Sequence, residues 1–183
     1  MVHIALLRGI NVGGRSRVAM SDLRSLFTRL GFREAQSLLQ SGNIVFECDG
    51  RSVAELESLF EAETEKRLKV RANYLVRTAE EWRQIVARNP FPREAKDDPS
   101  HLLVMFLKQA PTRKSVEALQ AAIRGPERVR AWDKQAYITY PEGIGRSKLT
   151  ITLIESKLGC RGTGRNWNTV LKLLALTEAW QSP

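Results

Sequence analysis

Residues 5–14, which read ALLRGINVGG, contain the residue types most able to bind an anion. A short apolar run leads into a glycine-rich turn, and a helical pattern begins at Met20. Glycine permits close approach of backbone N–H groups to an anion, and arginine adds a bidentate cationic group. We therefore expect an anion-binding loop here, formed by Arg8, Asn11, Gly13, Gly14, Arg15 and Arg17.

The same loop also has a purely structural interpretation, because glycine is common in tight turns and surface arginines are normally solvated. No Gly-Lys-Ser or Gly-Lys-Thr follows the glycines, so the segment is not a P-loop. The dinucleotide-binding pattern GxGxxG is absent as well. The motif therefore predicts an anion site without identifying the anion.

Two further segments, 143–148 (GIGRSK) and 161–166 (RGTGRN), place glycines, hydroxyls and cations ahead of predicted helices. Unpaired N–H groups and the helix dipole favour negative charge at a helix N-terminus. The candidate anion ligands are Arg146, Ser147, Lys148, Arg165 and Asn166. The alternative, that Asn166 only caps the last helix and Arg165 is solvated, stays open.

Hydrophobic periodicity predicts the order βαββαβ for the first half of the chain. The expected strands are 2–7, 37–40, 44–48 and 70–77, with helices starting near residues 20 and 53. In this ferredoxin-like order, the end of the first strand and the hairpin between the next two lie at one end of the sheet. We therefore expect Ser41 and Asn43, in a tight hairpin turn, to lie beside the loop 8–18.

The second half repeats this order without its last strand. Residues 78–81 form a capping-box pattern that begins an extra helix, and the polar, proline-containing segment 90–100 is typical of a linker. We predict an α+β fold of two ferredoxin-like lobes: βαββαβ over residues 1–89 and βαββα over 101–183, with a C-terminal helix. The missing strand predicts an exposed sheet edge that can pair with another chain.

The composition indicates an anionic partner. The formal net charge is +9, and residues 8–17 hold three arginines and no acid, so an anionic ligand or nucleic acid is expected. The catalytic residues are unknown, since no Ser/His/Asp pattern occurs, and no Cys/His cluster indicates a metal. No cofactor is expected. No apolar run is long enough to span a bilayer, so we expect a cytoplasmic protein with no membrane partner.

Several segments resemble one bacterial family, catalogued as domain of unknown function 1697. They are ALLRGINVGG, QSGNIVF at 40–46, HLLVMFL at 101–107, GRSKLT at 145–150 and RNWNTVLKL at 165–173. The likeness extends over residues 2–176, and it departs at Arg15, Ser16 and Arg17, where lysines and asparagines are expected. The resemblance implies a small cytoplasmic α+β protein and brings no established activity, cofactor or catalytic residue.

Three classes of function remain open at this point. The leading hypothesis is a binding protein that holds phosphate-bearing ligands or a nucleic-acid backbone through its Gly/Arg-rich loops. The first alternative is an enzyme acting on a small phosphorylated or carboxylated metabolite in a cleft between the lobes. The second is a structural or partner-binding protein. Whether the chain is a monomer or a homodimer is undecided.

Overall fold

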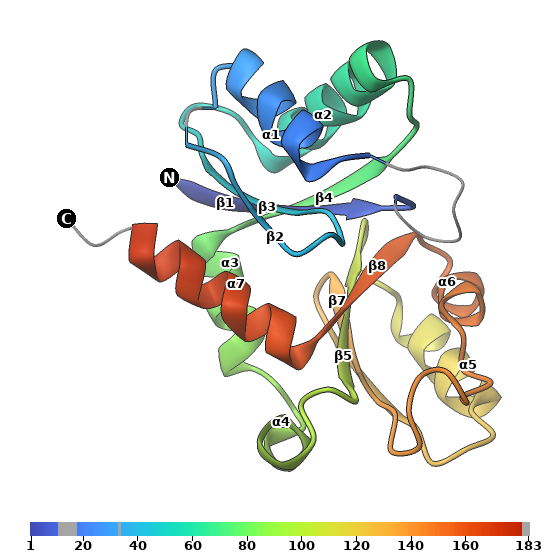
Figure 1. The fold of residues 1–183 in the computed structure, drawn as a ribbon. Coiled ribbons are helices and arrows are strands. Elements are labelled where there is room, and N and C mark those ends of the chain that lie inside the picture. The colour runs from blue at the N-terminus through green and yellow to red at the C-terminus, as the bar shows by residue number, and fades with distance from the viewer. Residues whose placement is uncertain (11–17, 33, 181–183) are drawn as a thin grey trace. The chain divides into compact units, whose positions relative to one another are not determined.

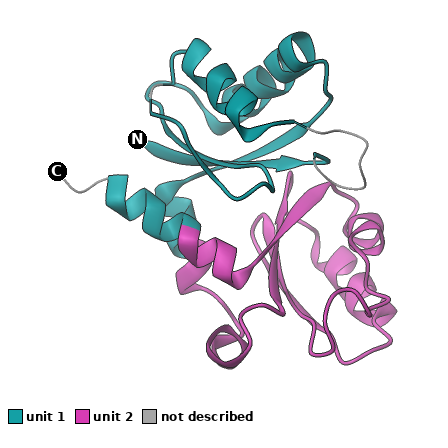
Figure 2. Ribbon diagram, viewed as in Figure 1, with its two compact units in different colours: residues 1–84, 173–183 teal, residues 85–172 magenta. Residues whose placement is uncertain are grey.

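The computed structural model describes residues 1–10, 18–32 and 34–180. The chain divides into two compact units, residues 1–84 with 173–183 and residues 85–172 (Figure 2). Residues 90–100, the predicted linker, contain a short helix, α4 (Pro92–Asp97).

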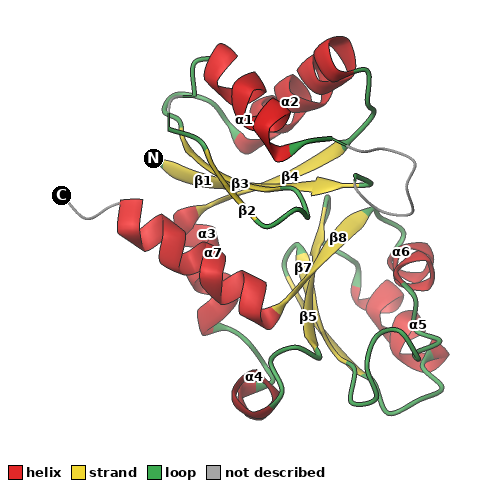
Figure 3. Ribbon diagram, viewed as in Figure 1, coloured by secondary structure: helices red, strands yellow, loops and turns green. Residues whose placement is uncertain are grey.

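The first unit is built on a four-stranded antiparallel sheet with the strand order β2-β3-β1-β4 (Figure 3). Its elements are β1 (Val2–Arg8), α1 (Met20–Arg29), β2 (Gln36–Leu38), β3 (Asn43–Glu47), α2 (Val53–Leu68) and β4 (Asn73–Thr78). On the central strand, Leu6 lies opposite Asn43 on one side and Leu75 on the other. The predicted βαββαβ order of the first half is therefore confirmed.

Helices α1 and α2 cover one face of this sheet (Figure 1). Aromatic side chains fill the space between the helices and the sheet. Phe27 of α1 stacks on Phe60 of α2, with ring centroids 4.3 Å apart. Phe46 of β3 meets the Phe60 ring edge-on at 5.3 Å, and Tyr74 of β4 lies 5.4 Å from it. Because each ring is buried from water, the cluster is the core that holds helices and sheet together.

A capping box begins α2. The backbone N–H of Glu55 donates to Ser52 Oγ at 3.3 Å, and Glu55 Oε2 accepts from the Ser52 N–H at 2.8 Å. These bonds satisfy two backbone donors that a helix start leaves unpaired. Accepting hydrogen bonds from Ser52 also lowers the pKa of the Glu55 carboxyl.

We predict that Ser52→Ala lowers the free energy of unfolding by about 1 kcal/mol, because the cap is lost while nothing buried changes. Urea denaturation followed by circular dichroism measures the effect. Ser58→Ala is the matched control: this side chain is exposed in the middle of α2 and donates to the Ala54 carbonyl within the same helix. We expect little change from it, and an equal loss in both variants would contradict a specific capping role.

The second unit repeats the same topology. Its sheet is antiparallel with the order β6-β7-β5-β8. The elements are β5 (Leu102–Leu107), α5 (Arg113–Ala122), β6 (Arg128–Trp132), β7 (Gln135–Thr139), α6 (Ile151–Leu158) and β8 (Gly162–Asn166). The division between the units falls within two helices, α3 (Ala79–Ala87) and α7 (Trp167–Trp180), each of which contributes residues to both units.

Strand β8 corrects the prediction for the second half. The sequence pattern predicts that GTGRN is a loop before the last helix, so the predicted βαββα order lacks a strand. Instead this segment pairs antiparallel with β5, with Arg165 opposite Val104. A Cβ at Gly162 would overlap the Phe106 carbonyl oxygen, so the absence of a side chain permits the close pairing. The sheet is complete, and the argument for an exposed edge based on a missing strand is wrong.

The opposite edge of this sheet, strand β6, is partly blocked by α5. Gln120 Nε2 donates to the backbone carbonyl of Val129 on β6 at 3.0 Å. A side chain that occupies an edge carbonyl removes one of the groups that a strand from another chain needs for pairing. Helix α5 and helix α6 together cover one face of the sheet, and their core partners include Leu119, Ile138 and Ile154.

Across the ranges that the structure describes, no helix has both the length and the apolar character required to cross a lipid bilayer.

Candidate functional site

A pocket of about 350 Å³ lies in the second unit, where two loops meet. One loop joins α5 to β6 and contributes residues 122–127; the other joins β7 to α6 and contributes residues 142 and 146–149. The loops bring together cationic, acidic and apolar side chains: Arg124, Arg146 and Lys148; Glu127 and Glu142; Ile123, Leu149 and Leu153. Three residues proposed from sequence, Arg146, Ser147 and Lys148, therefore line one pocket.

The β7–α6 loop is held in place by hydrogen bonds. The buried Tyr140 hydroxyl donates to the Leu149 carbonyl at 3.0 Å, and the Gly143 N–H donates to the Tyr140 carbonyl at 2.8 Å. Gly143 has φ +85°, a conformation that glycine adopts without strain. Burial raises the pKa of Tyr140 well above its ordinary value, so the hydroxyl keeps its proton and remains a donor. The loop is thus ordered before any ligand arrives.

Ser147 and Glu127 connect the two loops across the pocket. Ser147 Oγ donates to Glu127 Oε1 and accepts from the Leu149 N–H at 2.9 Å. The other carboxylate oxygen of Glu127 lies over Gly125, in the space that a Cβ at that position would need. Gly125 therefore leaves room for the carboxylate in its observed position.

The pocket has more positive than negative charge. Arg124, Arg146 and Lys148 are exposed, and within the described ranges none of the three side chains forms an ion pair. Two carboxylates, those of Glu127 and Glu142, line the pocket together with three cations, and Glu127 already accepts a hydrogen bond from Ser147. Cations that are not neutralised by a neighbouring acid are available to an anion from solution.

The N-terminal candidates are only partly described. Arg8 ends β1, and the Leu7 N–H donates to the Gly42 carbonyl at 2.8 Å, so the β2–β3 hairpin does lie beside the end of the first strand. Asn43 is buried, and its Nδ2 donates to the Leu38 carbonyl at 2.8 Å and to Ser41 Oγ at 2.9 Å. The side chain of Asn43 therefore shapes the turn. Five candidates lie outside the described residues: Asn11, Gly13, Gly14, Arg15 and Arg17.

Arg165 and Asn166 do not line the pocket. Arg165 lies on β8, 7% exposed, and its guanidinium donates to Thr163 Oγ1 at 2.8 Å and to the Gly164 carbonyl at 2.9 Å. Burial lowers its pKa to about 10. Asn166 Oδ1 accepts from the Thr169 N–H at 3.0 Å, so Asn166 caps α7, which was the alternative interpretation of this residue.

Sequence reasoning missed Arg124 and Glu127. They follow the end of α5 in a Gly-Pro turn, which carries no binding pattern of its own. Their place in the pocket arises because the α5–β6 and β7–α6 connections lie at the same end of a βαββαβ sheet. The βαββαβ topology of the unit is therefore the signal that could identify this site. The prediction from sequence lacked the last strand of this unit, so it did not contain that topology.

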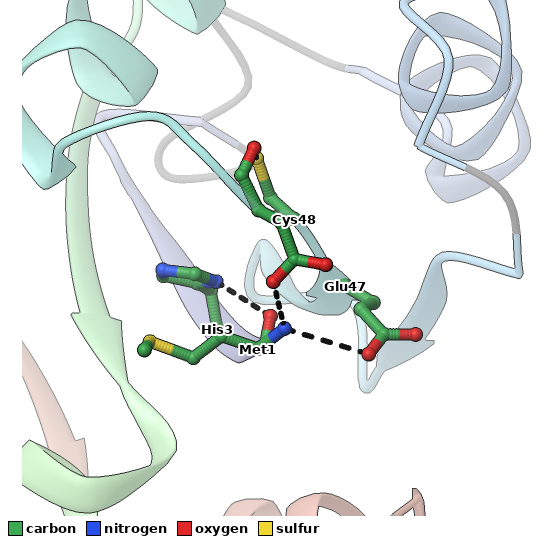
Figure 4. Close-up of polar contacts among 5 residues, drawn as sticks. Met1, His3, Glu47 and Cys48 are labelled. Carbon is green, nitrogen blue, oxygen red and sulfur yellow. Dashed lines mark hydrogen bonds and ion pairs between the residues drawn. The ribbon is translucent and has the colours of Figure 1, made fainter.

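The first unit has a cavity at the equivalent place, between the α1–β2 and β3–α2 connections, of about 680 Å³. Among the described residues, its charged lining is mainly acidic: Glu34, Glu47 and Asp49 against Arg51. Two of these acids hold the amino group of Met1, which lies 2.5 Å from Asp49 Oδ1 and 3.5 Å from Glu47 Oε1 (Figure 4). The hydrogen bond from the amino group lowers the pKa of Asp49. The described lining of this cavity is therefore less favourable to an anion than that of the second unit.

No group of three or more His, Cys, Asp or Glu side chains is arranged to hold a metal ion in the parts of the chain that the structure describes.

The fold is thus that of an α+β protein with two βαββαβ units. The second unit has a cationic pocket that is a candidate binding site. The chain belongs to the family described as protein of unknown function, DUF1697, whose model matches residues 1–137. Its fold is similar to that of the conserved bacterial protein SP0830 from Streptococcus pneumoniae. The TM-score is 0.75 at 22% identity, over 95% of this chain and 97% of that one. The comparison with curated proteins returned no match.

Proposed function

We propose that this protein binds a small phosphate-bearing molecule in the pocket of its second unit. The observation that carries the proposal is the convergence of Arg124, Arg146 and Lys148 on one concave site of about 350 Å³. Small-molecule sites are concave, and their volumes begin at roughly 300 Å³. Phosphate is well matched to an arginine and a lysine that have no acidic partner, because charge-assisted hydrogen bonds are the stronger ones.

The shape of the site favours a small ligand over a nucleic-acid backbone. Single-stranded nucleic acid is bound along an extended cationic groove. The cations here lie instead on two short loops that line one pocket. The hydrogen bonds of Tyr140 and Ser147 order the loops, so little conformational entropy is lost when a ligand binds. We include a cytoplasmic location in the proposal, because phosphorylated metabolites are abundant there.

We predict that Arg146→Ala and Lys148→Ala each weaken phosphate-ester binding about tenfold, by removing one charge-assisted contact. Isothermal titration calorimetry with inorganic phosphate, sugar phosphates and nucleoside monophosphates measures this, after a thermal-shift screen has ranked the panel. Lys114→Ala is the control, since Lys114 is an exposed cation of α5 that is not part of the pocket lining.

Equal losses in the control and the pocket variants would show that net charge alone attracts the ligands, and the proposal would fail. Binding confined to oligonucleotides, with a steep dependence on salt, would favour a nucleic-acid function instead. In that case Arg15 and Arg17, two arginines of the predicted N-terminal anion-binding loop, are the first residues to replace by alanine.

A further inference from the structure

The pocket contains a carboxylate that a site for phosphate alone does not need. Glu127 lines the same pocket as Arg124, Arg146 and Lys148, and its negative charge repels a phosphate group. Its Oε1 is occupied by Ser147, which fixes the orientation of the carboxylate. In the ranges that the structure describes, Oε2 accepts no hydrogen bond. A carboxylate held in this way is an oriented acceptor for a ligand hydroxyl or amine.

An apolar wall completes the pocket. Ile123 follows α5, Leu149 precedes α6, and Leu153 lies in the first turn of that helix. Leu149 is buried, and the other two are half-buried. Such a wall gains free energy only from a ligand with an apolar or aromatic portion, since a free phosphate ion buries no apolar surface.

The three kinds of lining group therefore select three parts of one ligand. On the basis of the function proposed above, we infer that the pocket accepts a phosphate monoester whose organic part carries vicinal hydroxyls and a flat apolar group. A ribonucleoside 5′-monophosphate is a simple molecule of this class. Its phosphate pairs with Arg146 and Lys148, its ribose hydroxyls donate to Glu127, and its base lies against the apolar wall.

The cavity of the first unit supports a selection made by side chains. It occupies the equivalent place between the corresponding loops, yet its described charged residues are mostly acidic. Among the residues that the structure describes, the same topology thus presents two different chemistries, and the second unit combines cations that form no ion pair with an oriented acceptor.

The test compares adenosine 5′-monophosphate, its 2′,3′-dideoxy analogue, ribose 5-phosphate and inorganic phosphate on the unmodified protein by calorimetry. We expect adenosine monophosphate to bind about tenfold more tightly than the dideoxy analogue, because the charged acceptor loses its donors in the latter. We expect ribose 5-phosphate to bind more weakly than the nucleotide, because it lacks the base.

Variants then assign the preference to Glu127. We expect Glu127→Gln to reduce the preference for the hydroxylated nucleotide to about twofold, since the charge of the acceptor is lost. Gly125→Ala, which places a Cβ where the carboxylate lies, should have a similar effect while keeping the charge. Glu117→Gln is the matched control, because it removes an exposed acid of α5 that does not line the pocket, and it should leave the preference unchanged.

The outcomes separate the two proposals. If phosphate or ribose 5-phosphate binds as tightly as the nucleotide, and Arg146→Ala weakens that binding, the inference is overturned. The phosphate-binding function then still stands. Equal affinity for the nucleotide and its dideoxy analogue would also overturn the inference. Binding of none of the four compounds would remove both. Circular dichroism and melting temperature confirm that each variant is folded.

Discussion

Phe60→Ala should lower the free energy of unfolding by about 3–5 kcal/mol, the largest effect we expect from a single substitution in this chain. Phe60 is fully buried, and its ring contacts Phe27, Phe32, Phe46 and Tyr74 at centroid distances of 4.3, 5.2, 5.3 and 5.4 Å. These rings come from α1, the segment after it, β3 and β4. Truncation leaves a cavity that rigid aromatic neighbours fill poorly, so transfer and cavity costs add.

Differential scanning calorimetry and urea denaturation measure this loss, with a decrease in melting temperature of roughly 10 °C expected for a chain of this length. Phe60→Leu should cost less than half as much, because it keeps part of the buried volume. Leu59→Ala is the positional control: Leu59 is the neighbouring residue on α2 and is only partly buried. Equal losses from Phe60→Ala and Leu59→Ala would contradict a central role for the aromatic cluster.

Gly162→Ala should destabilise the second unit by about 3 kcal/mol, at the upper end of the usual cost of overpacking. A Cβ at this position meets the Phe106 backbone oxygen, and it would also lie 2.8 Å from Met105 Cε and 2.9 Å from Leu107 Cδ2. The side chains can rotate away, but the carbonyl belongs to the central strand β5 and can move only with its strand. The pairing of β8 with β5 must therefore widen.

Hydrogen–deuterium exchange measures this effect where it occurs. We expect faster exchange of the β5 and β8 amides in Gly162→Ala than in the unmodified protein, with the β1–β4 amides little changed. Gly145→Ala is the matched control, because nothing lies within 4 Å of a Cβ at that position. Its stability should stay within about 0.5 kcal/mol. If Gly162→Ala behaves like Gly145→Ala, the close approach of the two strands is not what makes glycine necessary.

Most of the first unit could be predicted from the sequence, because its elements are encoded locally. The apolar run in β1 and the spacing of Leu23, Leu26 and Phe27 in α1 assign each element from its own residues. The expected capping box before α3 is present, with the Glu81 N–H donating to Thr78 Oγ1 at 3.1 Å and Glu81 Oε2 accepting from the Thr78 N–H at 2.7 Å. Short-range hydrogen bonds of this kind need no tertiary information.

The candidate site could be predicted only in part. Arg146, Ser147 and Lys148 stand together in the sequence, so the pattern of glycine, cation and hydroxyl before a helix identified them. Glu127 lies twenty positions before Ser147, and its hydrogen bond to that residue exists because β6 and β7 form a hairpin that returns the chain to the same end of the sheet. No local pattern encodes that approach.

By itself, then, the amino-acid sequence determined the α+β class, the strands and helices with strong apolar periodicity, and one of the two loops of the pocket. Only the tertiary structure decided that Gly162–Asn166 is a strand, that Arg165 is buried on it, and that Arg124 and Glu127 belong to the site. The physical reason is the same in each case. GTGRN has no apolar alternation of its own, and its strand conformation comes from the backbone of β5, which it can approach because it has no side chain at Gly162.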